Sequence, residues 1–246
     1  MSYLNDTNGL WNQLGGARRV QLTDRKLYVS PGGGMKRLIV ACDGTWNGIL
    51  GGGTTNVEKL ARTVQIDPTR SSGMPQVVYY VTGVGTGDRL DRMMGGALGV
   101  GTQVKMLGAY RFLSLNHSYG DQIYIFGFSR GAFLARGLAS FISTVGLMTH
   151  HGFAAGQSAI AVATYLESRG IRTDFTSLES IEEFARRWTR PTHIAFLGVF
   201  DTVGEIGIGD KGRAVRRYDT RLHPAVRVAR QALAIDEHRT KFVPQL

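Results

Sequence analysis

The sequence predicts an α/β protein in which a mostly parallel, doubly wound sheet carries helices on both faces. Four mainly apolar segments are predicted as strands, at 38–42, 77–81, 121–127 and 194–200, and the continuous apolar run at 38–42 is typical of a strand buried on both sides. Segments with apolar residues at helical spacing alternate with these runs, which indicates parallel strands joined by helical crossovers. The glycine-rich PGGG closes residues 1–35, which are expected to be a flexible N-terminal segment before one domain at 36–246.

The helices are predicted from apolar periodicity and from their end signals. Apolar residues recur at helical spacing in five segments, at 54–65, 100–116, 128–145, 159–168 and 180–188. Asn56 is the expected N-cap of the first, and Gly146 is the expected stop after the third. Proline is favoured at the first position of a helix, so a further helix is expected from Pro224 to about Glu237. The partly polar helices at 150–190 are expected to form a cap over a site.

Composition places the chain in an ordinary globular class, with 43% hydrophobic and 20% charged residues among 246. No apolar stretch reaches about 18 residues, so no spanning helix is expected. The N-terminus lacks a basic start followed by an apolar run, so no signal peptide is expected either. Cys42 is the sole cysteine. A single cysteine excludes an internal disulfide and a cysteine-rich zinc site, and this low count favours synthesis in the cytoplasm.

The formal net charge is +10, from 29 Lys and Arg against 19 Asp and Glu. Basic residues are densest between Lys211 and Arg230, and a run of this kind suits contact with an anionic membrane surface. A solvated helix or loop face is the alternative interpretation. The sequence lacks the alternation of aromatic and basic residues that is typical of an RNA-binding sheet, so no nucleic acid partner is expected.

A G-x-S-x-G motif runs from Gly127 to Gly131, between a predicted strand and a predicted helix. In serine hydrolases such a motif forms a nucleophile elbow, a sharp turn that lifts the serine hydroxyl above the end of the strand. The glycines leave room for the strand and the helix to approach closely. Ser129 is therefore the candidate nucleophile, and the backbone N–H of Arg130 is a candidate oxyanion donor. A glycine-flanked serine at an ordinary turn is the alternative.

A serine nucleophile needs a carboxylate and a histidine, which follow the serine along the chain in hydrolases of this fold. Asp201 directly follows the predicted strand 194–200 and is the candidate acid, with an aspartate that caps a turn as the alternative. The second oxyanion donor is expected in the loop after the first strand, as a main-chain N–H of Gly44 or Thr45. A tight turn with an Asx-type bond from Asp43 is the alternative there.

The general base is harder to place. Only His223 and His238 follow Asp201 in the chain. His223 lies directly before Pro224, where a helix start is expected, so His238 is the remaining candidate base within these residues.

Eight collinear segments between residues 36 and 244 resemble the uncharacterised alpha/beta hydrolase domain family, which includes type VI secretion phospholipase effectors of the first lipase class. The segments are RLIVACDGTWN, TTNVEKLAR, VYYVTGVGTG, GGALGVGTQV, AYRFL, GDQIYIFGFSRGAFLARGLASFI, FLGVFDTVG and ALAIDEHRTKFVP. The DGTWN and GFSRGA blocks are the most specific. The resemblance implies an α/β-hydrolase-like fold, with Ser129 as nucleophile and Asp201 as triad acid. Export by a specialised secretion system is the corresponding expectation for localisation.

The histidine of this family lies in a block similar to W-F-x-G-x-H, after the position of Pro244. This chain ends at Leu246, so the resemblance implies that one or more C-terminal strands and the general base are missing. It also implies that His238 does not inherit the role. Such an incomplete domain is expected to be weakly active or inactive, and to associate through an exposed sheet edge.

The predicted function is hydrolysis of a carboxylic ester, with phospholipid or other lipid esters favoured, through an acyl-enzyme on Ser129. This mechanism requires no metal or organic cofactor. A non-catalytic interaction module on a hydrolase scaffold is the alternative function, and short-chain esters and acyl-thioesters are alternative substrates. The glycine-rich stretch at 83–87 lacks the spacing of a dinucleotide or phosphate loop, so nucleotide binding is not expected.

Overall fold

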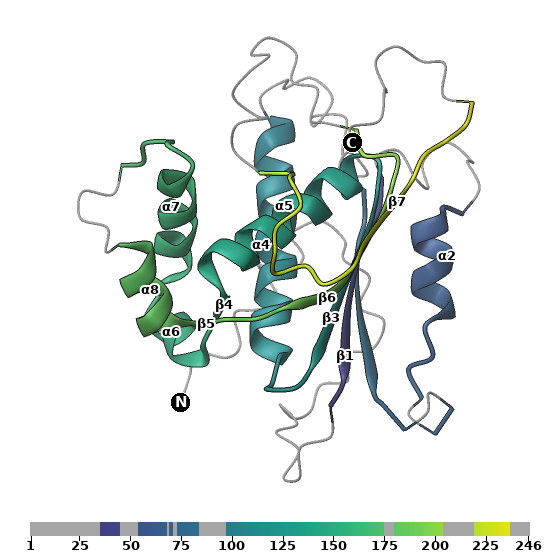
Figure 1. The fold of residues 1–246 in the computed structure, drawn as a ribbon, viewed down its shortest axis with the longest axis horizontal. Helices are drawn as coiled ribbons and strands as arrows, with labels where there is room; N and C mark the ends of the chain where they lie inside the picture. Colours follow the sequence, from purple (N-terminus) through teal and green to yellow (C-terminus); the bar gives the residue numbers. More distant parts are fainter. Residues whose placement is uncertain are drawn as a thin grey trace.

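The computed structural model describes residues 35–44, 54–67, 69–70, 73–83, 97–174, 180–203 and 219–236. Within this part of the chain, parallel strands form one five-stranded sheet in the order β2-β1-β3-β6-β7 (Figure 1). The strands are β1 (Arg37–Cys42), β2 (Gln76–Val81), β3 (Gln122–Phe128), β6 (Ile194–Phe200) and β7 (Ala229–Ala232). The α/β prediction is therefore confirmed, and so are the four apolar runs predicted as strands. The N-terminal segment expected to be flexible lies outside the described residues, apart from Met35.

The burial of each strand explains its sequence pattern. In the inner strand β1, Leu38 to Cys42 are at most 5% exposed, because helices and side chains cover both faces of the sheet there. A continuous apolar run is the pattern expected of such a strand. Strand β3 alternates instead, with Ile123 and Ile125 fully buried on one face and Tyr124 and Phe126 half-buried on the other.

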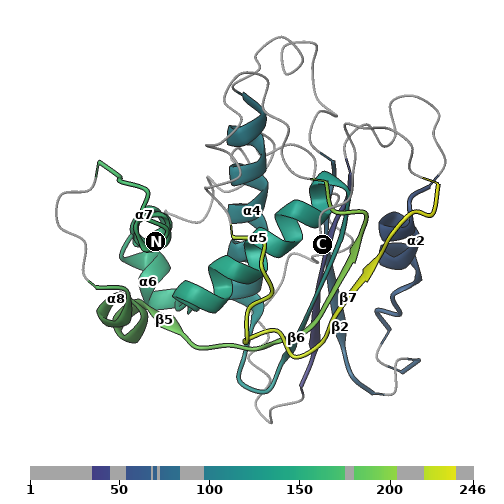
Figure 2. The ribbon, with the colours of Figure 1, turned by 45° about the horizontal axis from the view of Figure 1, so that its top comes forward.

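Helices cover the two faces of the sheet unequally. Helices α4 (Ala97–Asn116) and α5 (Arg130–Val145) lie on one face, and α2 (Asn56–Thr63) lies on the other (Figure 1 and Figure 2). The larger hydrophobic core lies beneath α4 and α5, whereas a smaller core around Ile39 and Val57 lies beneath α2. Burial of apolar surface on both faces is what holds the strands in one layer.

The N-cap of α2 differs from the prediction by one residue. Thr55, not Asn56, has the extended backbone of an N-cap, and its hydroxyl accepts a hydrogen bond from the Glu58 N–H over 3.0 Å. Both residue types cap helices well, so composition alone could not choose between them. The Thr55 hydroxyl also donates to the Asp43 carboxylate, a long-range contact that favours Thr55.

The helix predicted from Pro224 to Glu237 is wrong. The chain forms a turn there and then strand β7, which lies parallel to β6. The N–H of Ile194 donates to the carbonyl of Ala225, and the N–H of Leu197 donates to that of Val228, each over 2.9 Å. The edge of β6 therefore supplies hydrogen-bond partners that a helix in this segment would leave unused.

The helices expected as a cap lie at the far end of α5. They are α6 (His150–Ala154), α7 (Ser158–Ser168) and α8 (Ile181–Trp188), with a two-stranded sheet of β4 (Leu147–Met148) and β5 (Thr189–Arg190). The Ser140 and Tyr165 hydroxyls are 3.1 Å apart, and the Thr189 hydroxyl donates to the Val145 carbonyl. Both contacts involve the C-terminal half of α5, so the described parts of these helices lie beside the sheet rather than over its carboxyl edge (Figure 1).

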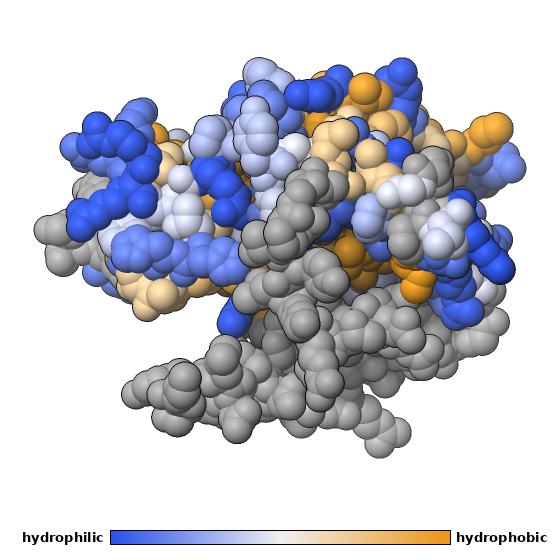
Figure 3. Space-filling view, turned by 90° about the horizontal axis from the view of Figure 1, so that it is seen from below, coloured by the Kyte–Doolittle hydropathy of each residue, from blue (hydrophilic) through white to orange (hydrophobic). Residues whose placement is uncertain are grey.

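The surface of the molecule is uneven in polarity. Seen from below, hydrophilic surface covers the side of α6, α7 and α8, and hydrophobic surface gathers on the side where α2 and β7 lie (Figure 3). Exposed apolar side chains flank β7, among them Leu233 at 47% and Ile235 at 98% exposure. Of the helices that the structure describes, none combines the length and the apolarity that crossing a membrane requires.

Candidate active site

The carboxyl ends of β1 and β3 meet where the strand order reverses. From β1 the chain crosses to β2 on one side, and from β3 it crosses to β6 on the other. In open parallel sheets, ligands bind in the crevice beyond the strand ends at such a switch point. Asp43 follows β1 and Ser129 follows β3, so the topology points to the edge of the sheet that the G-x-S-x-G motif predicts.

Ser129 lies between the last residue of β3 and the first residue of α5. Its backbone has φ 55° and ψ −121°, and its side chain is half-buried. Its N–H donates to the Phe200 carbonyl over 2.9 Å, and its carbonyl accepts from the Ala132 N–H in the first turn of α5 over 3.0 Å. This is the sharp strand-to-helix turn expected of a nucleophile elbow, with the serine at its tip.

The two motif glycines permit this turn because no side chain would fit at either position. A Cβ placed on Gly127 would lie 2.5 Å from the Gly131 carbonyl oxygen. A Cβ on Gly131 would lie 2.3 Å from the Cys42 carbonyl oxygen. Both neighbours are main-chain atoms, which cannot move without shifting β1 or α5. The close approach that the motif predicts is therefore present.

Asp201 emerges beside Ser129. Phe128 and Phe200 are paired at the ends of β3 and β6, and neighbouring strands lie about 4.8 Å apart. The residues that follow this pair, Ser129 and Asp201, are the only non-glycine residues with positive φ in the described part of the chain, at 55° and 44°. Backbone strain of this kind concentrates at functional sites.

The Asp201 turn is held from the side of β7. The Asp201 N–H donates to the Ala232 carbonyl over 3.0 Å, and one Asp201 carboxylate oxygen accepts from the Ala234 N–H. Thr202 is fully buried, and its hydroxyl donates to the side-chain oxygen of Gln231 over 3.1 Å. Strand β7 thus fixes the position of the candidate acid, which the sequence could not reveal because this segment reads as a helix.

The two predicted oxyanion donors lie on either side of the elbow. Arg130 is the first residue of α5, and the first N–H groups of a helix have no acceptor within the helix. The Gly44 N–H donates to the Asp43 carboxylate over 2.7 Å, a bond to the next residue, whereas an Asx turn bonds the N–H two residues on. An oxyanion at Gly44 would therefore compete with Asp43. Thr45 lies outside the described residues.

Asp43 is a buried carboxylate at this edge that sequence reasoning treated only as a turn residue. It is 3% exposed, and it accepts hydrogen bonds from the Gly44 N–H and from the hydroxyls of Thr55 and Tyr80. Burial raises the pKa of Tyr80, and the hydrogen bond to Asp43 raises it further. The available signal was an aspartate directly after a fully buried strand.

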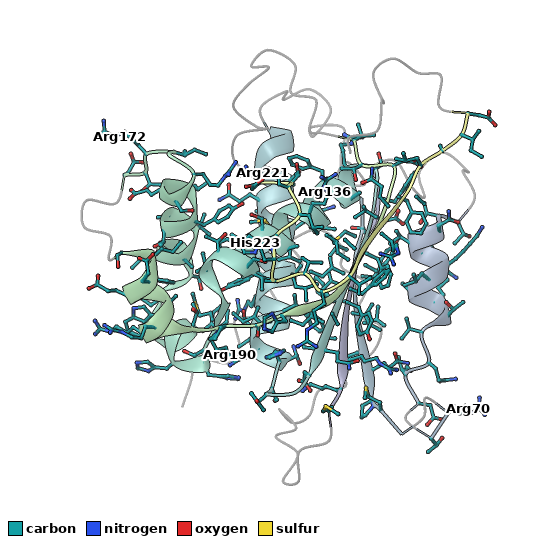
Figure 4. The ribbon with its side chains drawn as sticks, viewed as in Figure 1. Arg70, Arg136, Arg172, Arg190, Arg221 and His223 are labelled. Carbon is teal, nitrogen blue, oxygen red and sulfur yellow. The ribbon has the colours of Figure 1, made fainter. Side chains whose placement is uncertain are left out.

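The histidines of the described residues lie away from this edge. His117 follows the C-terminus of α4 and His193 precedes β6, both at the amino ends of the strands, and His150 and His151 begin α6. His223 lies on the connection to β7 (Figure 4), three residues before Val226, which bridges to Ile194 at the start of β6. The candidate base His238 lies outside the described residues, two positions beyond Asp236, after the chain leaves β7 at the carboxyl edge.

Comparison with known proteins shows the family of this chain. Residues 36–246 match the family model described as the T6SS phospholipase effector Tle1-like catalytic domain. The chain belongs to this family. The match to the Tle1-like catalytic domain confirms the resemblance drawn from the sequence blocks, and the parallel sheet agrees with an α/β-hydrolase-like fold.

A curated relative of this Tle1-like domain is the uncharacterised protein YEL023C of Saccharomyces cerevisiae. It is 29% identical over 231 aligned residues, which cover 84% of this chain and 32% of the yeast protein. The chain thus spans about a third of the length of that relative. No solved structure matches the chain.

Proposed function

We propose that this chain is the catalytic part of a serine hydrolase that cleaves carboxylic esters of lipids, with phospholipids as the substrate class. The observation that carries the proposal is the position of Ser129, which stands at a strained elbow between β3 and α5 with Asp201 emerging beside it. Membership of a phospholipase effector family supports the substrate class.

In the proposed mechanism Ser129 Oγ attacks the acyl carbonyl carbon while a histidine takes the hydroxyl proton. The alcohol leaves with that proton, and an acyl-enzyme ester remains on Ser129. Water then attacks this ester and passes a proton to the same histidine, which returns it to Ser129 Oγ as the fatty acid leaves. The Arg130 N–H, together with the N–H of Gly44 or Thr45, holds the oxyanion in both steps.

Asp201 is the proposed acid that orients the histidine and stabilises its charged form. Its carboxylate lies where β7 leaves the sheet, because it accepts from the Ala234 N–H. His238 follows four residues later and is the candidate base of this chain. A histidine in a block similar to W-F-x-G-x-H, after the position of Pro244, is the alternative that the family resemblance implies. Loss of activity in His238→Ala would favour the first.

Surface chemistry supports two further partners, which we propose here. The net charge of +10 supports contact with an anionic membrane surface. Residues 211–218 of the basic run lie outside the described residues, and in the described part Arg221 pairs with Asp219. The exposed apolar residues that flank β7 support association through the edge of the sheet.

The direct experiment is fatty-acid release from phospholipid vesicles by the full chain and by Ser129→Ala. Loss of a serine nucleophile costs about a thousandfold or more in turnover. Ser143→Ala, on the same helix α5, is the matched control and should keep wild-type activity. Equal activity of Ser129→Ala and wild type would contradict the proposal. A folded protein without any esterase activity would favour the non-catalytic interaction module.

A further inference from the structure

Asp43 is a buried, charged side chain that no step of the proposed mechanism uses. Its residue is only 3% exposed, at the carboxyl end of the inner strand β1. Burying an ionised carboxylate costs several kcal/mol unless hydrogen-bond donors replace the lost water. A carboxylate that is buried at this cost next to a candidate site is therefore expected to hold neighbouring groups of the site in place.

Three donors from different parts of the chain converge on this carboxylate. The Gly44 N–H donates to Oδ1 over 2.7 Å, and the Thr55 hydroxyl donates to Oδ2 over 2.8 Å. The Tyr80 hydroxyl also donates to Oδ2. Thr55 is the N-cap of α2 and Tyr80 belongs to β2. Asp43 therefore ties the end of β1 to its own loop, to β2 and to the start of α2.

The main chain that Asp43 holds touches the elbow on both sides of Ser129. A Cβ on Gly131, after the serine, would lie 2.6 Å from the Asp43 carbonyl oxygen. A Cβ on Gly44 would lie 2.8 Å from the Phe128 ring, before the serine. Because these groups are already in close contact, any shift of the Asp43–Gly44 main chain changes its distance from Gly131 and from the Phe128 ring.

We infer that Asp43 is a positioning residue of this site. Its carboxylate fixes the main chain of Asp43 and Gly44, which packs against the elbow from both sides and so holds Ser129 and the Arg130 N–H in place. The inference rests on the proposed function. The Ser129 hydroxyl and the Arg130 N–H act in the transition state rather than in the ground state, so a displaced elbow lowers kcat and leaves KM almost unchanged.

Kinetics of Asp43→Asn, Asp43→Ala and Tyr80→Phe test the inference. In Asp43→Asn the amide keeps the size of the side chain but replaces an acceptor by a donor, so the Asp43–Gly44 main chain loses its anchor. We expect kcat to fall about tenfold or more, below the roughly 10²–10³ that the loss of a whole oxyanion donor costs, with KM within about twofold. Tyr80→Phe removes one of the three donors described above and should lower kcat about two- to fivefold.

Tyr165→Phe is the matched control for Tyr80→Phe. It also removes a hydroxyl that makes buried hydrogen bonds, to Ser140 and to the Asp219 N–H, but at the far end of α5. It should leave kcat unchanged even where it lowers stability. Wild-type kcat in Asp43→Asn would overturn the inference. So would a rise in KM alone, or an equal loss of kcat in Tyr165→Phe.

Hydrogen exchange gives a readout that does not depend on catalysis. In Asp43→Ala the Gly44 amide loses its acceptor and should exchange at least about tenfold faster than in wild type, while the amides of α5 keep their rates. Unchanged exchange at Gly44 would overturn the inference even if the variant were inactive. Failure of the proposed function shows separately, as Ser129→Ala with full activity, and exchange then still decides whether Asp43 holds Gly44.

Discussion

The residues that define the candidate site are those where the backbone is least relaxed. Ser129 and Asp201 have positive φ, which costs a non-glycine residue roughly 1–3 kcal/mol. The elbow was predictable because its glycines and serine stand in one short motif. The contacts of Asp43 were not, because Thr55 and Tyr80 come from elements 12 and 37 residues away. Local sequence therefore predicts the turn at Ser129 better than the side chains that surround it.

Gly131→Ala should be strongly destabilising. The added Cβ would lie 2.3 Å from the Cys42 carbonyl oxygen, and overpacking against rigid main chain costs about 1–3 kcal/mol. Gly170→Ala is the control, since Gly170 has φ +71° but no atom within 4 Å of the added Cβ, and it should cost only about 1 kcal/mol of conformational strain. Urea unfolding measures both. A loss no larger in Gly131→Ala than in Gly170→Ala would show that the elbow can relax.

Cys42 should be unreactive in the folded protein. Its side chain is fully buried, and that burial raises the pKa of the thiol, so the reactive thiolate is scarce at pH 8. A thiol reagent should leave the native protein unmodified and modify one cysteine per chain in urea. Stoichiometric modification without denaturant would contradict the packing of β1.

At the scale of elements, the apolar pattern of the local sequence predicts the long strands and most helices. The exceptions are segments whose structure depends on pairing with another strand. The segment after Pro224 reads as a helix because its apolar spacing fits one, yet it pairs with β6 as β7. The two-residue strands β4 and β5 carry no pattern long enough to detect. In both cases hydrogen bonds between segments far apart in the sequence determine the structure. A short stretch of sequence contains only one partner of each bond, so it does not predict the pairing.

The link between β6 and β7 should stabilise the Asp201 turn. The buried Thr202 hydroxyl donates to Gln231, so Thr202→Val should cost about 1–2 kcal/mol and slow ester hydrolysis several-fold. Thr164→Val is the control, because the buried Thr164 hydroxyl has no hydrogen-bond partner among the residues that the structure describes, and its loss should be neutral or stabilising. Thermal unfolding with parallel activity assays separates the two. Equal effects would mean that the Thr202 bond does not hold the turn.

At the scale of the whole molecule, the parallel sheet and its two helical layers were predictable, but the place of α6 to α8 was not. Alternating strands and helices fix the layers through the handedness of crossovers. The position of the helical group depends instead on side-chain contacts such as Ser140 with Tyr165, which no periodicity encodes. The described parts of these helices lie beside the sheet, and a cap formed by residues 150–190 stays a prediction.

The stability of the molecule should fall in acid through His117. Burial and the neighbouring Arg190, which lies near the amino ends of the strands (Figure 4), lower its pKa from 6.5 to about 4. In the unfolded chain His117 thus binds a proton below pH 6.5, whereas in the folded chain it binds this proton only below about pH 4. The contribution of His117 to stability is present above pH 6.5 and declines between pH 6.5 and 4.

Urea unfolding across this pH range measures the effect. His117→Gln should flatten the decline, whereas His150→Gln, at an exposed histidine, should leave it unchanged. An identical pH dependence in wild type and His117→Gln would show that His117 titrates alike in both states.

The central claim is that Ser129 is a nucleophile, and covalent labelling of the folded full chain by a fluorophosphonate tests it most directly. The reagent should phosphonylate Ser129, located by mass spectrometry of the peptide that contains Gly127 to Gly131, and Ser129→Ala should remain unlabelled. A folded wild-type protein that resists labelling, or a label that persists in Ser129→Ala, would contradict the account.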